Sequence, residues 1–324
     1  MLNLQPGKWA VVSSILSGVL YGISLRLLAN LHHSVMTLAF VLLGPFAMGF
    51  VTIWVAERKQ RQSVATWIIL PWITFFLAMI GMLVTLLEGM ICVVMLLPIG
   101  LLLTSLGGLL AGLIVRGLPS VRPQGLPVMV VMVLPMLVGL MERRYLERNE
   151  FRTVETIIDI HAAPETVWRN IERVREIHPA ELQHSWTSRI GFPRPEEATL
   201  SFEGVGAVRH ASFAGGVVFL ETVDVWEPQH TLSFSIHVDQ MPSKTLDEHV
   251  QVGGAYFDVL RGEYRLEPLT GGVTRLHLSS QHRLSTDFNW YAHLWTDRIM
   301  ADIQGNILQV IKNRCEQEQR EQKP

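Results

Sequence analysis

The stretch TVETIIDIHAAPETVWRNI, residues 153–171, has the pattern of a β-strand followed directly by a short helix. In residues 153–160 apolar and polar side chains alternate, as they do in a strand with one buried face. Pro164 stands where the helix would begin, and Glu165 lies in its first turn. Apolar residues then recur at helical spacing, at Val167, Trp168, Ile171 and Val174. This unit is typical of a soluble α+β domain.

Strands and one long helix are predicted after this unit. Residues 176–196 are irregular and interrupted by prolines. Six runs then predict strands, with glycine-containing turns such as PLTGG between them: 198–203, 206–213, 216–227, 230–239, 255–267 and 273–284. A continuous apolar stripe predicts a helix over 288–316. Because such a sheet needs a cover for its apolar face, we expect this helix to lie across it and to leave an interior cavity.

The first 140 residues have a different composition. They hold only nine charged side chains, seven basic and two acidic, so their net charge is +5. Because the whole chain has a net charge of −2, residues 141–324 have a net charge of −7. Apolar runs of about 20 residues, the length that crosses a bilayer, predict five spans at 9–29, 34–56, 65–87, 90–115 and 125–141. We therefore predict a multi-pass transmembrane domain over 1–142, a soluble domain over 150–316 and a polar tail over 317–324.

Basic loops predict how the spans are oriented in a cell membrane. The loops at 57–62 and 116–122 are rich in arginine and lysine, which places them and the N-terminus on the cytoplasmic side. Five complete spans would put the soluble domain on the opposite side, whereas the arginine-rich segment 141–152 favours the cytoplasm, so both placements stay open. Glycines in the fourth span predict close helix packing, at Gly107, Gly108 and Gly112.

Several motifs of the soluble part together resemble a known superfamily. They are VETIIDIHAAPETVWRNI (154–171), GVGAVRHASFAGG (204–216), ETVDVWEPQHTLSFSI (221–236) and RGEYRLEPLTGGVTRLHLSSQHRL (261–284). Residues 150–316 resemble the START-like, helix-grip superfamily, also called SRPBCC, the polyketide cyclase/dehydrase and lipid-transport group. The resemblance implies an α+β fold, with an antiparallel sheet around a long C-terminal helix and a cavity for a hydrophobic ligand. It implies no single activity, because members share no catalytic residue.

Three residues are candidates for acid–base chemistry. His282 shares a strand face with apolar neighbours, so we expect it to point inward, as a general base, a hydrogen-bond donor to a ligand or a structural histidine. The same parity leaves His277 in solvent. Arg209 or its neighbour points inward in mid-strand and would need a partner such as Glu221. Tyr291 is the third candidate.

Aromatic residues supply further candidate ligand contacts. The start of the last helix carries a cluster of aromatic rings, which would lie at one end of the cavity or pack in the core. Two aromatic residues lie on the apolar faces of their strands. The predicted ligand-binding residues are Trp290, Tyr291, Trp295, His282, Phe234 and Tyr264.

The sequence argues against several classes of site and partner. His178 and His184 lack the companions of a metal site, and no phosphate-binding loop occurs, so neither a metal nor another cofactor is expected. The acidic soluble part argues against nucleic-acid binding. The expected partners are the lipid bilayer and a hydrophobic or amphipathic small molecule, such as a lipid or a polyketide-like compound. Alternatives are a cyclase or dehydratase, or a non-catalytic regulatory or assembly protein; the sequence does not indicate an oligomeric state.

Overall fold

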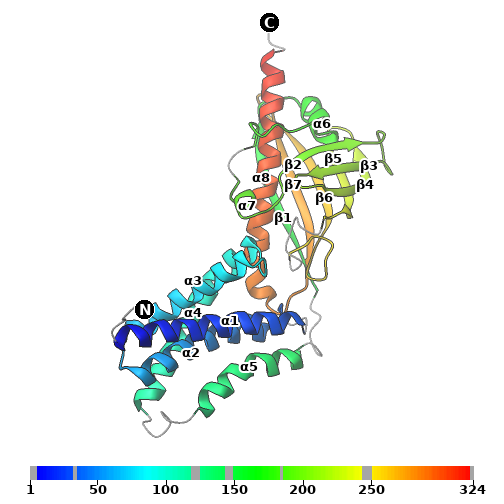
Figure 1. Cartoon of the computed structure of the whole chain (residues 1–324). Coiled ribbons are helices and arrows are strands. Elements are labelled where there is room, and N and C mark those ends of the chain that lie inside the picture. Colours follow the sequence, from blue (N-terminus) through cyan, green and yellow to red (C-terminus); the bar gives the residue numbers. More distant parts are fainter. Residues whose placement is uncertain are drawn as a thin grey trace. The chain divides into compact units, whose positions relative to one another are not determined.

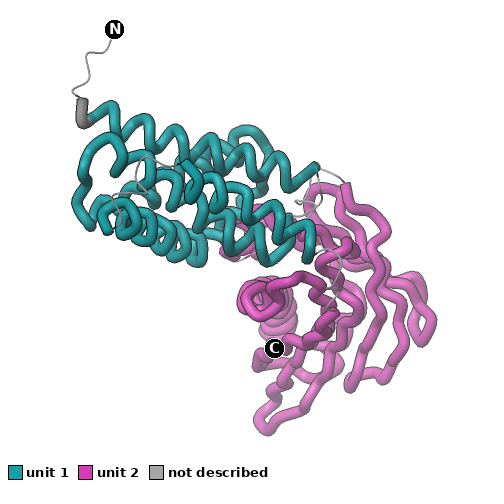
Figure 2. Tube along the Cα trace, turned by 90° about the horizontal axis from the view of Figure 1, so that it is seen from below, with its two compact units in different colours: residues 1–147 teal, residues 148–324 magenta. Residues whose placement is uncertain are grey.

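The computed structural model describes residues 6–31, 35–117, 125–142, 149–182, 185–242 and 250–321. The chain forms two compact units, residues 1–147 and 148–324, drawn in different colours in Figure 2. The described elements of unit 1 are helices, and those of unit 2 are a sheet and helices.

Unit 1 consists of apolar helices. Four segments are long and apolar enough to cross a membrane, at Lys8–Leu31, Ala39–Lys59, Thr66–Val84 and Met90–Gly117. A fifth apolar helix has only 17 residues, and at 1.5 Å per residue it is about 26 Å long, slightly less than a hydrocarbon core of about 30 Å. The elements are α1 (Pro6–Leu31), the π-helical turn η1 (Ala39–Leu43), α2 (Gly44–Lys59), α3 (Thr66–Val84), α4 (Met90–Gly117) and α5 (Leu126–Glu142).

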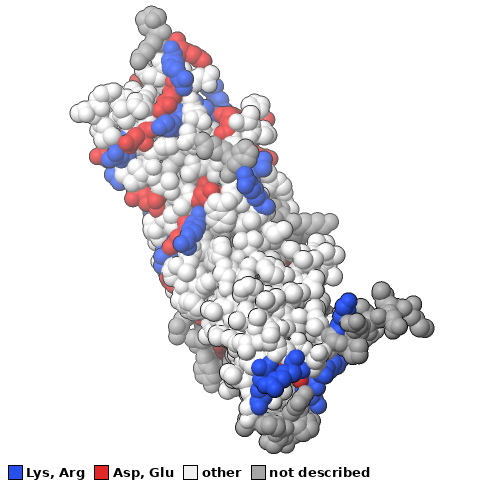
Figure 3. Space-filling view, turned by 90° about the vertical axis from the view of Figure 1, so that its left-hand side faces the viewer, with Lys and Arg blue, Asp and Glu red and all other residues white. Residues whose placement is uncertain are grey.

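A polar cluster joins the ends of α2 and α4. The buried Glu57 carboxylate accepts hydrogen bonds from Trp67 Nε1 at 2.5 Å and from Arg116 Nη2 at 2.9 Å. Arg116 also donates to the Gln62 carbonyl oxygen, and its guanidinium lies 4.2 Å from the Trp67 ring centroid. The basic segments around residues 57–62 and 116 therefore lie at the same end of unit 1, where Figure 3 shows Lys and Arg gathered.

Unit 2 contains a seven-stranded antiparallel sheet in the order β1-β7-β6-β5-β4-β3-β2. Figure 1 shows the curved sheet with the long helix α8 along it. The predicted helix-grip fold class is thereby confirmed. The strands are β1 (Glu150–Ile160), β2 (Pro195–Leu200), β3 (Val208–Phe213), β4 (Val217–Glu227), β5 (Thr231–Gln240), β6 (Phe257–Leu269) and β7 (Val273–Leu284), and the helices are α6 (Pro164–Glu172), α7 (Trp186–Arg189) and α8 (Asn289–Glu321).

The core of unit 2 lies between the sheet and its helices. Pro164 begins α6, and Val167, Trp168 and Ile171 are buried from this helix. Trp168 packs edge-to-face on Trp226 of β4, with ring centroids 5.2 Å apart. The strand–helix unit at the start of the domain is thus fixed to the sheet, as its apolar spacing predicts.

One parity prediction is wrong. Strand parity predicts His277 of β7 in solvent, but this residue is only 7% exposed. Its Nδ1 lies 2.9 Å from a carboxylate oxygen of Glu155 and 3.0 Å from Arg265 Nη2, and its Nε2 lies 3.5 Å from Glu267. His277 does lie on the polar face of the sheet, but the longer charged side chains of neighbouring strands cover it.

Candidate functional site

A partly open cavity of about 140 Å³ lies between the sheet and α8. Strands β3 to β7 provide one wall, and α8 provides the opposite wall through residues 299–307. Most of the lining side chains are apolar, which suits an apolar molecule. The lining residues are Phe192, Pro193, Phe213, Val217, Phe219, Glu221, Phe234, Ile236, Met241, Val252, Phe257, Val259, Gly262, Tyr264, Leu278, Ser280, Ile299, Met300, Ile303, Gln304 and Ile307.

A buried ion pair lies at the β3–β4 side of the cavity. Arg209 and Glu221 are direct cross-strand partners, and Arg209 Nη1 donates to Glu221 Oε2. The side chain of Arg209 is 2% exposed and that of Glu221 is 12% exposed. The sequence predicts that Arg209 or its neighbour points inward and needs a partner such as Glu221, and in the structure Arg209 is the residue that does so. Only the carboxylate member of the pair lines the cavity.

Burial shifts the pKa values of the polar groups beside the ion pair. Loss of solvent raises the pKa of Glu221, and the nearby charge of Arg209 opposes this rise. Burial also raises the pKa of the Tyr264 phenol to about 12, so Tyr264 is a neutral hydrogen-bond donor and acceptor at pH 7. Tyr264 lies against Phe234, with ring centroids 6.2 Å apart.

A second polar group joins α8 to the sheet at the cavity wall. Gln304 Nε2 donates to the Val154 carbonyl oxygen at 3.1 Å and to Ser280 Oγ at 2.9 Å. Gln304 Oε1 accepts a hydrogen bond from Thr156 Oγ1 at 2.7 Å. Because these atoms satisfy one another, the group holds the helix at a fixed position over β1 and β7.

The predicted site residues fall into two sets. Phe234 and Tyr264 line the cavity. The lining that the structure describes does not include Arg209, His282, Trp290, Tyr291 or Trp295. The last three form a chain of aromatic contacts, with centroid distances of 5.8 and 6.5 Å, on the first turns of α8, before the helix reaches the cavity wall at residue 299. Their roles in ligand binding or catalysis stay predictions.

Gln304 is a lining residue that the sequence reading did not select. It lies four residues after Met300 and four before Leu308, so it is a polar residue on the buried face of an amphipathic helix. A polar residue that interrupts the apolar stripe of a helix indicates a buried polar contact, and the sequence shows this interruption at Gln304.

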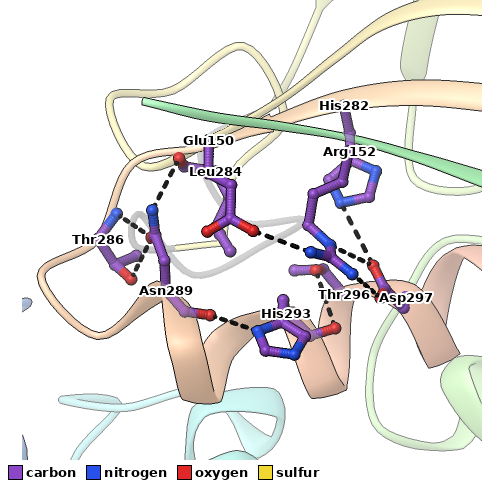
Figure 4. A network of polar contacts seen from close by, with 9 residues as sticks. All are labelled: Glu150, Arg152, His282, Leu284, Thr286, Asn289, His293, Thr296 and Asp297. Carbon is purple, nitrogen blue, oxygen red and sulfur yellow. Dashed lines mark hydrogen bonds and ion pairs between the residues drawn. The ribbon is translucent and has the colours of Figure 1, made fainter. Parts of the chain in front are cut away.

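His282 lies beside a separate, partly exposed network of charged side chains, shown in Figure 4. Arg152 binds Asp297 through two hydrogen bonds of 3.0 and 2.7 Å and binds Glu150 at 2.9 Å. The His282 ring is fully buried, and its Nε2 lies 3.9 Å from Asp297 Oδ1. Among the residues that the structure describes, neither ring nitrogen of His282 has a hydrogen-bond partner. Burial lowers the pKa of His282, and Asp297 opposes this shift.

We expect His282 to make unit 2 less stable in mild acid. Its pKa in the folded chain lies below the unfolded value of 6.5, so the folded state favours the neutral ring. The resulting stability is complete above pH 6.5 and is lost as pH falls through the folded pKa. Thermal unfolding from pH 7.5 to 5 should show this loss, and His282→Leu, which cannot titrate, should show a smaller one. Equal pH dependence in the two proteins would contradict the prediction.

Of three comparisons with known proteins, the comparison with solved structures found similar chains. No protein-family model matches the sequence, and no curated protein matches it. Norcoclaurine synthase from Thalictrum flavum, in complex with dopamine and hydroxybenzaldehyde, is 11% identical, with 54% of this chain and 90% of that chain covered and a TM-score of 0.33. A protein from Nitrosospira multiformis is 20% identical (52% and 99% covered, TM-score 0.30). A protein from Thermus thermophilus is 17% identical (52% and 99% covered, TM-score 0.33).

Proposed function

We propose that this chain is a membrane-anchored helix-grip protein that binds a hydrophobic or amphipathic small molecule between the sheet and α8. The observation that carries the proposal is the apolar cavity of about 140 Å³. An engineered apolar cavity of about 150 Å³ in another protein stays dry and binds benzene. Moving apolar ligand surface from water into such a cavity stabilises the bound state by about 25 cal/mol of free energy per Å² of surface buried.

The helical unit supports the membrane part of the proposal. Four of its segments have the length and composition of membrane spans. Only seven residues separate the end of α5 at Glu142 from the start of β1 at Glu150. A domain tethered this closely to a bilayer would meet apolar molecules where they partition most strongly.

The proposal is tested by occupancy of the cavity in the full-length chain, reconstituted in lipid nanodiscs. The probe is 4-fluorotoluene, followed by ¹⁹F NMR, and the matched control is Ile303→Trp, which places a larger side chain in the cavity wall. We expect a bound signal with the wild-type chain that is at least about tenfold weaker with Ile303→Trp, since overfilled sites exclude guests. Equal signals from both proteins would show that the probe partitions into lipid alone, and the proposal would fail.

A further inference from the structure

We propose that the ligand of this cavity carries an uncharged hydroxyl group, as an alcohol or a phenol, that donates a hydrogen bond to Glu221 and accepts one from Tyr264. The inference rests on the proposed function and specifies the chemical class of its ligand. Glu221 and Tyr264 both line the cavity, in a wall that is otherwise mostly apolar. A ligand with one polar end and an apolar body matches this distribution.

Arg209 positions Glu221 and also binds two backbone carbonyl groups. Its Nε donates to the Glu172 carbonyl oxygen at 3.2 Å, and its Nη2 donates to that of Ile171 at 3.1 Å. These are carbonyl groups at the C-terminal end of α6, where a cation is favourable. The guanidinium also lies 4.9 Å from the centroid of the Phe234 ring. Arg209 therefore holds the carboxylate in place, and it is not among the described residues that line the cavity.

Glu221 retains an oxygen for a ligand. Its Oε2 accepts the hydrogen bond from Arg209, and no donor among the described residues binds Oε1. The side chain is 12% exposed, and it borders the cavity that a ligand would fill. A carboxylate oxygen in such a setting is more stable when it accepts a hydrogen bond. The ligand atom that meets it must therefore be a donor.

The charges of the lining exclude an acidic ligand. Among the described lining residues, Glu221 is the one carboxylate, and there is no lysine, arginine or histidine. A fatty-acid carboxylate or a phosphate would meet the charge of Glu221 without a free cation. An ammonium group would add a positive charge beside the already neutralised Arg209–Glu221 pair. A neutral hydroxyl avoids both charge penalties, and its oxygen can accept a hydrogen bond from Tyr264.

The volume limits the apolar body of the ligand. A cavity of about 140 Å³ suits a single ring or a short chain. Four probes of matching size therefore separate the possibilities: 4-fluorobenzyl alcohol, 4-fluorotoluene, 4-fluorobenzoate and 4-fluorobenzylamine. Each is titrated into the full-length chain in nanodiscs and followed by ¹⁹F NMR, with Ile303→Trp as the filled-cavity control. We expect the alcohol to bind at least about fivefold more tightly than the benzoate or the amine, as one buried hydrogen bond would give.

Two variants test the polar contacts. In Glu221→Gln the ratio of alcohol to toluene affinity should fall about fivefold, while benzoate binding rises because Arg209 has lost its counter-charge. In Tyr264→Phe that ratio should fall about threefold, with benzoate binding unchanged. Opposite changes for the alcohol and the benzoate cannot arise from a loss of fold. If either variant fails to fold, the relative affinities of the four probes for the wild-type chain still test the hydroxyl inference.

The outcomes separate the two proposals. If 4-fluorotoluene binds the wild-type chain and not Ile303→Trp, the cavity takes up apolar molecules and the proposed function stands. If benzoate then binds as tightly as the alcohol, or Glu221→Gln leaves the alcohol-to-toluene ratio unchanged, the hydroxyl inference is overturned alone. If none of the four probes distinguishes the wild-type chain from Ile303→Trp, both proposals fail.

Discussion

Replacing Arg209 with methionine is expected to destabilise unit 2 by about 3–5 kcal/mol, the range for removing one partner of a buried ion pair. Methionine fills a similar volume but donates no hydrogen bond. The variant would leave the Glu221 carboxylate without its counter-charge and two carbonyl groups at the end of α6 without their donor. Hydrogen–deuterium exchange of the full-length chain, read in peptides from β3 and β4, measures the loss locally.

The same variant should acquire a distinctive pH dependence. Without Arg209 the pKa of Glu221 rises further, because only the desolvation effect remains. A raised pKa gives stability that is complete below the unfolded value of 4.5 and is lost as pH rises through the folded value. The exchange difference from wild type should therefore be smaller at pH 5 than at pH 8.

A double variant is the matched control for this prediction. Arg209→Met combined with Glu221→Leu replaces the pair by apolar side chains, a change that is often neutral when both charges leave together. We expect exchange in β3 and β4 to return most of the way to wild type. If the double variant is as unstable as Arg209→Met, the cost comes from the lost contacts with α6 and not from the unpaired carboxylate.

The strands of unit 2 could be predicted closely because each combines alternation with a clear turn. β7 has the predicted bounds, and β4 begins at Val217, one residue after its predicted start. The alternation places Phe234 and Tyr264 correctly, since side-chain direction in a strand depends only on parity. The predicted β2 begins about three residues too late, where its pairing with β3 is irregular.

The site could be predicted only in part because its position along α8 is a tertiary property. The sequence predicts that the aromatic residues at the start of α8 lie at one end of the cavity or pack in the core, and the α8 residues of the described lining begin at Ile299. A helix sequence reveals which face is buried, whereas the distance between helix and sheet at each turn depends on sheet curvature. The interactions of Gln304 with β1 and β7 likewise join residues 24 or more positions apart.

Replacing Gly107 with leucine should have the largest effect in unit 1. A Cβ atom at Gly107 of α4 would lie 2.0 Å from the Phe46 carbonyl oxygen of α2, and one at Gly49 of α2 would lie 2.0 Å from the Thr104 carbonyl oxygen of α4. The two backbones therefore meet directly, as the small-residue spacing predicts. A leucine must separate them, and we expect a loss of about 3 kcal/mol or more. Thermal denaturation in detergent, followed by size-exclusion chromatography, measures it.

Gly117→Leu is the matched control on the same helix, because a Cβ atom there meets no other atom within 4 Å. The control should denature at the wild-type temperature, since a leucine facing open space meets no packing constraint. Gly107→Ala should fall between the two, because a single methyl group requires a smaller separation of α2 and α4 than an isobutyl group. Equal stability of Gly107→Leu and Gly117→Leu would mean that α2 and α4 are not in backbone contact, and unit 1 would need a different packing.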